Sequence, residues 1–123
     1  MSKARLARLS NAELVALFRE YAIMQERVLL DSNTRKYNKL YDKMAAIDAE
    51  LRGRGLEARK ALLTLLSDKN GRVRYAAAVK SLGVDRDRAI AALREIEAFC
   101  KMPEAGDAGM TLLHLERGIF KPT

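Results

Sequence analysis

Few side chains in this sequence have the chemistry of acid–base or nucleophilic catalysis. Cys100 and His114 are the only cysteine and the only histidine in the 123 residues. A cysteine and a histidine together can supply a thiolate and a general base, but the spacing of these two matches no such motif. A structural zinc site needs several cysteine or histidine ligands, so the sequence excludes one. We therefore predict no catalytic residue, no metal ligand and no cofactor.

The acidic pairs and the glycine-rich segment also lack the geometry of a reactive site. Asp85 and Asp87 are two positions apart, so on a helix their carboxylates point in different directions. The Arg-Gly-Arg-Gly segment at residues 52–55 follows a predicted helix rather than a strand, which is untypical of a phosphate-binding loop. These patterns predict a protein that is not an enzyme and that acts through a binding surface.

Composition indicates a soluble, helical, cytoplasmic protein. Hydrophobic residues make up 49% of the chain and charged residues 32%, which is typical of globular proteins. Only two prolines interrupt a chain rich in good helix formers. No apolar run approaches the roughly 20 residues that span a bilayer, and the basic N-terminus lacks the apolar core of a secretion signal. A single cysteine agrees with a reducing compartment, so we expect a cytoplasmic location and no membrane partner.

The net charge of +7 is concentrated in the first two-thirds of the chain. Residues 1–80 contain 17 Lys and Arg against 9 Asp and Glu, whereas residues 81–123 contain 6 against 7. This asymmetry favours an acidic partner, nucleic acid included. The other interpretation is a solvated basic surface that only keeps the protein in solution.

Two amphipathic helices are predicted in the N-terminal half. Ser10 and Glu13 match a capping box at the start of the first helix, which extends to about Leu30. The residues at three- and four-residue steps on its apolar face are Leu14, Phe18, Tyr21, Ala22, Val28 and Leu29. The corresponding face of the second helix carries Tyr37, Leu40, Tyr41, Met44, Ile47 and Leu51. Near-heptad spacing in the second helix favours antiparallel packing against the first.

Gln25 and Asn38 fall on or beside these two apolar faces. Each is expected to form a hydrogen bond at a helix contact, and the two are candidate partners for each other. The alternative for Gln25 is a position lining a groove.

A helical hairpin is predicted over residues 56–82. A leucine-rich helix ends at a polar break, residues 67–71, and Asn70 is positioned to cap the alanine-rich helix that follows. A hairpin of this length cannot bury both of its faces, so neighbouring helices must cover it.

A further helix is predicted to begin after Asp85, and a loop is expected over residues 101–107 because of Pro103 and Gly106. The last helix is expected at about residues 108–116, with Met110 on its buried side. Ile119 and Phe120 are expected to fold back onto the body.

The hairpin resembles a HEAT repeat. The matching residues are Leu62, Leu63, Leu65, Leu66, Asp68, Val73, Arg74, Ala77 and Ala78. The resemblance implies that Asp68 and Arg74 orient turns and neighbouring repeats rather than act on a substrate.

Over about residues 12–117, the chain also resembles a small bacterial family known as a domain of unknown function with a HEAT/armadillo-like fold. The marks are Phe18, Gln25, Leu29, Asn38, Glu50, Leu51, Arg54, Gly55, Val73, Arg74, Ala77, Ala78, Met110, Thr111 and Leu112. This resemblance implies a bacterial cytoplasmic protein with no established activity.

The predicted fold class is all-α. We expect about six helices in antiparallel pairs, stacked as a short HEAT-like right-handed superhelix. Residues 1–123 are predicted to form one domain, with an N-terminal arm at residues 1–9 and a tail at residues 118–123.

The predicted partner-binding surface lies mainly on the second helix of the hairpin. Arg72, Tyr75, Val79 and Lys80 fall away from the stripe expected to be buried, and Arg59 and Lys60 on the preceding helix add charge. Arginine combined with an aromatic residue is typical of interfaces. The alternative is an ordinary solvent-facing side of the helix.

The predicted function is an interaction module that binds a protein or peptide, with an acidic partner favoured by the charge, as an adaptor or a toxin-neutralising immunity protein does. The alternative is a nucleic-acid binder that uses the basic N-terminal two-thirds. Against that alternative, the candidate stacking aromatics are Tyr37, Tyr41 and Tyr75, and two of them fall on a predicted core stripe. The sequence does not determine the oligomeric state.

Overall fold

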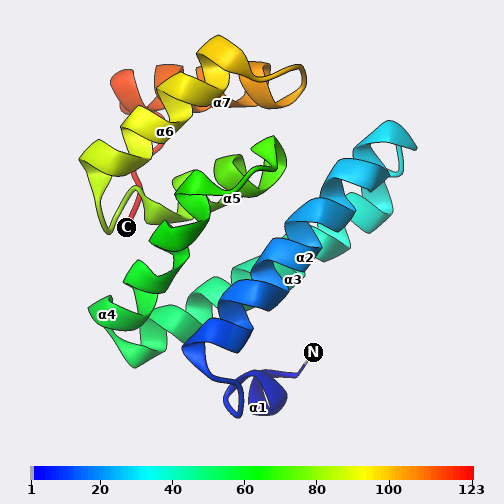
Figure 1. The fold of residues 1–123 in the computed structure, drawn as a ribbon, viewed down its shortest axis with the longest axis vertical. Coiled ribbons are helices and arrows are strands. Elements are labelled where there is room, and N and C mark those ends of the chain that lie inside the picture. The colour runs from blue at the N-terminus through cyan, green and yellow to red at the C-terminus, as the bar shows by residue number, and fades with distance from the viewer. Residues whose placement is uncertain (1) are drawn as a thin grey trace. The chain divides into compact units, whose positions relative to one another are not determined.

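The computed structural model describes residues 2–123, and these residues contain helices and no strand. The all-α prediction is confirmed. The elements are α1 (Lys3–Leu6), α2 (Asn11–Leu30), α3 (Thr34–Arg54), α4 (Leu56–Arg59), the 3-10 helix η1 (Lys60–Ser67), α5 (Gly71–Ser81), α6 (Arg86–Phe99) and α7 (Glu104–Glu116) (Figure 1). The described residues thus form more helices than the expected number of about six, because α1 is an additional turn and the helix expected from Leu56 is divided into α4 and η1.

The chain divides into two compact units, the first ending at Ala61 and the second comprising Leu62–Thr123. Helices α1 to α4 belong to the first unit, α5 to α7 belong to the second, and the division falls inside η1. The prediction of one domain over residues 1–123 stays a prediction. Across residues 2–123, no helix combines the length and the apolar character needed to cross a membrane.

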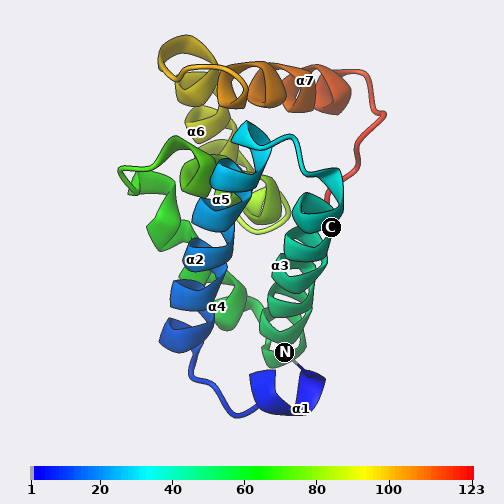
Figure 2. The ribbon, with the colours of Figure 1, turned by 90° about the vertical axis from the view of Figure 1, so that its right-hand side faces the viewer.

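The first unit is built on the antiparallel hairpin of α2 and α3, which lie side by side (Figures 1 and 2). The Ser10 hydroxyl accepts from the Glu13 backbone N–H at 3.1 Å, and the Glu13 carboxylate accepts from the Ser10 N–H at 3.0 Å, which confirms the capping box. The two helices bury an apolar seam made of Leu14, Phe18, Ala22, Leu40, Met44, Ile47 and Leu51. This seam is most of what the sequence predicted for both faces.

Arg54 ties three segments of the first unit together. Its Nε donates to Glu50 at 2.9 Å, its Nη1 to the Asn11 side chain at 3.0 Å, and its Nη2 to the Leu6 carbonyl at 3.1 Å. Leu6 is buried, so part of the predicted N-terminal arm is a helical turn held by the end of α3.

In the second unit, α6 packs against both α5 and α7. The Asn70 side chain accepts from the N–H groups of Arg72 and Val73 at the start of α5, which confirms the predicted cap. The core cluster comprises Ala78, Leu82, Ala89, Leu93, Ile96 and Ala108. Phe120 packs against this cluster as expected, whereas Ile119 is 66% exposed, so the expectation for Ile119 was wrong.

Two predictions about helices were wrong. The leucine-rich segment is not an α-helix: residues beyond Arg59 form the 3-10 helix, whose period of three aligns Leu62 with Leu65 so that both are buried. The loop expected over residues 101–107 ends early, because α7 begins at Glu104 directly after Pro103. Proline has a fixed φ suited to a helix start, and two acidic residues in the first turn favour the positive end of the helix dipole.

Tyr41 and Met110 were wrongly predicted to be buried. Tyr41 is 53% exposed and Met110 is 50% exposed. Tyr41 follows the buried Leu40 by one position, which turns it by about 100° around α3 and away from the seam. The apolar stripe of each helix is therefore narrower than the sequence pattern suggested.

Replacing the cap residue should destabilise α2. Ser10→Ala removes the hydroxyl that satisfies the Glu13 N–H, so we expect the free energy of unfolding to fall by about 1 kcal/mol. Urea unfolding followed by circular dichroism measures this. Ser67→Ala is the matched control, because the Ser67 hydroxyl only donates to the Thr64 carbonyl. Equal losses in the two variants would show that the capping box adds nothing.

The capping box should also make stability depend on pH. The Ser10 backbone N–H, and secondarily the Ser10 side chain, lower the pKa of Glu13. The contribution of the ionised carboxylate is therefore complete above the ordinary pKa of glutamate and is lost as the pH falls through the lowered value. The stability difference between the native protein and Glu13→Gln should shrink over that range. The carboxyl carbon shift of Glu13 in an NMR titration checks the pKa, and a midpoint at or above the ordinary value would contradict this prediction.

Candidate functional site

The predicted partner-binding surface on α5 is largely occupied by contacts within the second unit. Arg72 is only 3% exposed, and its Nη1 donates to the Asp107 carboxylate of α7 at 2.8 Å. The guanidinium also lies over the ring of Tyr75, 5.0 Å from its centroid. Arg72 was therefore wrongly predicted to face a partner, because a buried guanidinium needs a carboxylate and finds one on α7.

Tyr75 joins the same set of contacts. Its hydroxyl is 3.0 Å from the Thr111 hydroxyl, and Thr111 in turn donates to the Asp107 carbonyl at 3.0 Å. Val79 and Lys80 are half-buried on the following turn of α5. Arg72 and Tyr75 thus join α5 to α7 rather than form an open surface.

Arg59 and Lys60, the other two predicted surface residues, belong to the first unit. Arg59 is half-buried, and Lys60 is exposed with its amine 3.3 Å from the Glu57 carboxylate. An exposed ion pair three residues apart contributes little to binding or to stability. Neither residue lines any of the three hollows of the first unit described below.

The four residues predicted to have structural roles differ in their surroundings. The Asp68 carboxylate accepts from the Asn70 N–H at 2.9 Å inside the turn before α5. Arg74 Nη2 lies 3.4 Å from the sulfur of Cys100, which links α5 to the end of α6.

Gln25 is buried on α2, whereas Asn38 is exposed on α3. The pairing expected between Gln25 and Asn38 is wrong, because Asn38 follows Tyr37 away from the seam. Within residues 2–123, the Gln25 Nε2 has no hydrogen-bond partner.

A groove of about 310 Å³ opens along one edge of the α2–α3 hairpin. Seven residues line it: Met24, Arg27 and Val28 from α2, and Lys36, Lys39, Leu40 and Lys43 from α3. We call it the α2–α3 groove. Its floor is aliphatic, with Met24 44% exposed and Leu40 9% exposed. The rest of its lining is cationic, and none of the seven residues is acidic.

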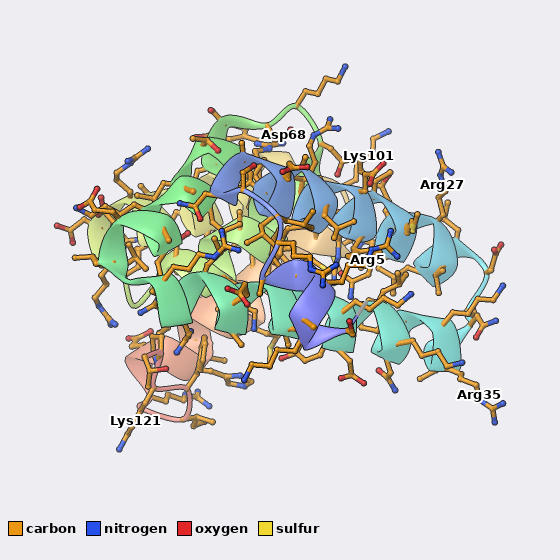
Figure 3. The ribbon with its side chains drawn as sticks, turned by 90° about the horizontal axis from the view of Figure 1, so that it is seen from below. Arg5, Arg27, Arg35, Asp68, Lys101 and Lys121 are labelled. Atoms are coloured by element: carbon orange, nitrogen blue, oxygen red, sulfur yellow. The ribbon has the colours of Figure 1, made fainter. Side chains whose placement is uncertain are left out.

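The cations of the groove are available to an anion. Arg27, Lys36, Lys39 and Lys43 are all exposed, and none of them forms an ion pair with another of residues 2–123. Figure 3 shows Arg27 extending away from α2. Lys43 lies over the ring of Tyr21, 5.5 Å from its centroid, which fixes one cation at the edge of the groove.

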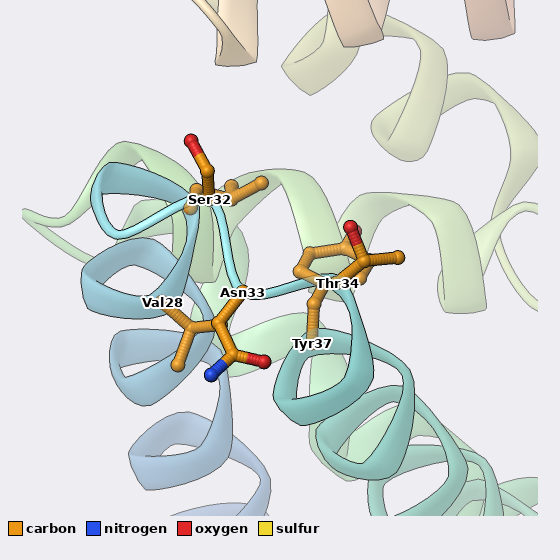
Figure 4. Close-up of a pocket in the computed structure, with 6 residues that line it drawn as sticks. Val28, Ser32, Asn33, Thr34 and Tyr37 are labelled. Carbon is orange, nitrogen blue, oxygen red and sulfur yellow. The ribbon is translucent and has the colours of Figure 1, made fainter.

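A smaller hollow of about 120 Å³ lies where α2 turns into α3. It shares Val28 with the groove and is otherwise lined by Leu29, Ser32, Asn33, Thr34 and Tyr37 (Figure 4). The Asn33 side chain accepts from the Lys36 N–H at 3.1 Å and so caps α3. Polar groups of this hollow are thus used by the turn itself.

A third hollow, of about 490 Å³, is larger, but the arginine that lines it already has partners within the first unit. It lies between α1 and α3, and its lining includes Lys3, Leu6, Glu50, Gly53 and Arg54. Its Arg54 donates to Glu50 and to the Leu6 carbonyl, so the charge is compensated internally. The α2–α3 groove is the better candidate binding site because its four cations form no ion pair within residues 2–123.

Sequence reasoning missed the groove, although part of its signal was present. Lys36, Lys39 and Lys43 recur at three- and four-residue steps, so they share one side of the second helix, next to Leu40. The contribution of α2 depends on how the two helices face each other, which the pattern of one helix does not determine.

No reactive constellation accompanies the groove. Among residues 2–123 there is no group of three or more His, Cys, Asp or Glu side chains that could hold a metal ion. His114 is half-buried on α7, and its carbonyl accepts from the N–H groups of Ile119 and Phe120 in the tail. The groove offers apolar contact and positive charge, which is the chemistry of binding.

Comparison with known proteins gives one family and one similar solved structure. The family model described as a domain of unknown function, DUF2019, matches residues 12–116. The crystal structure of the protein RPA1889 from Rhodopseudomonas palustris CGA009 superimposes with a TM-score of 0.91 at 38% sequence identity. The match covers 96% of this chain and 98% of that one. The comparison with curated proteins found no match.

Removing one partner of the ion pair between α5 and α7 should lower the free energy of unfolding more than removing the other. Asp107→Ala leaves a buried guanidinium without its carboxylate and should cost about 3 kcal/mol of unfolding free energy. Arg72→Met removes the buried charge and leaves a half-exposed carboxylate, so its cost should be about 1 kcal/mol. Chemical denaturation measures both, with Glu95→Ala on the exposed side of α6 as control. A larger cost for Arg72→Met would contradict the assignment.

Proposed function

The chain belongs to the DUF2019 family, and from that premise we propose that it is a non-enzymatic interaction module whose α2–α3 groove binds a segment of a protein or peptide. The observation that carries the proposal is the composition of the groove. The groove has an aliphatic floor beside four cations that form no ion pair within residues 2–123. This arrangement suits a partner segment in which an apolar side chain lies next to anionic side chains. An adaptor or a toxin-neutralising immunity protein needs such a surface and no reactive group.

We further propose that the protein is bacterial and cytoplasmic and that its helix pairs are HEAT-like. The sequence of residues 62–78 supports this relationship. The hydrogen bond from Asn70 to the Asp68 carboxylate is consistent with the role of a turn aspartate in such a repeat. The 3-10 form of η1 departs from the α-helix that opens a regular HEAT repeat, so any repeat here is an irregular one.

Nucleic acid is the second candidate partner. Exposed cations attract phosphates as well as carboxylates, and the first unit carries 13 Lys and Arg against 8 Asp and Glu. Tyr41 adds an aromatic side chain that is 53% exposed, contrary to the burial expected from the sequence. Fluorescence anisotropy with random-sequence duplex DNA at low salt tests this second partner.

Placing a charge on the floor of the groove should abolish partner capture. Met24→Glu puts a carboxylate among the apolar contacts, so the amount of any partner retained from a native lysate should fall at least tenfold. Quantitative mass spectrometry of the captured proteins measures this. Met110→Glu is the matched control, because Met110 is 50% exposed on α7 and Met24 is 44% exposed on α2. If both variants retain the same proteins, the groove is not the binding surface.

A further inference from the structure

The charge pattern of the α2–α3 groove points to one chemical class of partner. Resting on the proposed function, we propose that the groove binds an acidic protein segment in which an aliphatic side chain is flanked by carboxylates. The aliphatic side chain enters over Met24, Val28 and Leu40, and the carboxylates pair with the lysines of α3.

The volume of the groove sets the size of the apolar part. At about 310 Å³ it is near the lower end of the volumes, roughly 300–1,000 Å³, that hold small ligands. One or two aliphatic side chains fill a hollow of this size. Met24 is the exposed part of the floor, and its flexible thioether adapts to side chains of different shape.

The cations define a line along α3. Lys36 and Lys43 are seven positions apart, which places them about 10 Å apart along the helix axis, with Lys39 between them. Carboxylates spaced by one or two helical turns on a partner therefore find a lysine at each position. Arg27 adds a fourth cation to the lining of the groove, from α2.

Acidic residues on α2 restrict where the carboxylates of the partner go. Glu20 lies four positions before Met24, and Asp31 lies four positions after Arg27 at the C-cap of the helix. Both are exposed and repel a second carboxylate. The acidic side chains of the partner are therefore expected over α3, and its aliphatic side chain toward α2.

The aromatic residues of the hairpin favour a protein partner over single-stranded nucleic acid. None of the seven lining residues is aromatic, whereas single-stranded nucleic acid is bound largely by stacking of bases on exposed rings. Tyr41 follows Lys39 by two positions, so the two side chains project from nearly opposite sides of α3. Tyr21 lies beneath Lys43 and is half-buried.

Three synthetic peptides test the class of partner. The first has a leucine flanked on both sides by glutamates at three- and four-residue steps, the second replaces the glutamates with glutamine, and the third replaces the leucine with serine. Fluorescence anisotropy with the full chain at about 50 mM salt measures their affinities. We expect the first peptide to bind at least about tenfold more tightly than the other two, and its affinity to fall as salt increases.

Charge reversal then locates the site. The double variant Lys36→Glu/Lys39→Glu should weaken binding of the first peptide at least about tenfold, since two attractions become repulsions. Lys101→Glu/Lys121→Glu is the matched control with the same change in net charge. Both of its lysines are exposed and lie in the second unit, and both are labelled in Figure 3. The control variant should bind within about twofold of the native chain.

Four results would overturn the acidic partner. One is no binding of the first peptide at low salt, and another is equal loss of affinity in both double variants, which indicates only general charge attraction. The third is binding of duplex DNA alone, with loss in Lys36→Glu/Lys39→Glu, which assigns the lysines to phosphates. Capture from lysate that depends on Met24 but not on these lysines would keep the interaction role and remove the acidic partner.

Discussion

The apolar seam between α2 and α3 fixes where the lysine and arginine side chains of these two helices must lie. Burial of Phe18, Met44 and Ile47 sets the rotation of both helices about their axes. Lysine and arginine cannot enter the seam without a partner, because removing an isolated charge from water is costly. They therefore line its edge, where the aliphatic side chains at the margin of the seam remain partly open. The groove is thus a consequence of packing, and its charge is a consequence of exclusion from the seam.

In the second unit, an arginine is buried with a partner instead of being excluded from the core. Arg72 lies at a buried position of α5 and is compensated by Asp107 and by the ring of Tyr75. These contacts connect α5 and α7, which also exchange the hydroxyl hydrogen bond between Tyr75 and Thr111. Arg72 and Tyr75, which were predicted to bind a partner, instead hold α5 and α7 together. The composition of an interface and the composition of a buried polar contact are similar, since both bury a guanidinium against an aromatic ring.

Local interactions were the most predictable part of this molecule. Ser10, Asn70 and Asp85 each satisfy backbone N–H groups within three residues, so the adjacent sequence contains the whole interaction. The stripes that form the core were predictable for the same reason, because helical spacing is a local property.

Contacts between distant segments were the least predictable part. Arg72 and Asp107 are 35 residues apart, and no pattern near Arg72 indicates its carboxylate. To predict the α2–α3 groove, one must know how α2 and α3 face each other as well as how the lysines are spaced on α3. The positions of Asn38 and Tyr41 relative to the seam were wrongly predicted, because the sequence does not determine the width of the buried stripe. Residues at the margin of the stripe can be either buried or exposed.

The 3-10 helix η1, inside which the division between the two units falls, is longer than the same residues would be as an α-helix. Its eight residues span about 16 Å at the 3-10 rise, whereas the same residues would span about 12 Å as an α-helix. An α-helical winding would shorten this segment by about 4 Å and would rotate Leu62 and Leu65 out of alignment. Leu66, which also lies on η1, packs against the core cluster of the second unit. The winding of η1 therefore determines which of its leucines the second unit can bury.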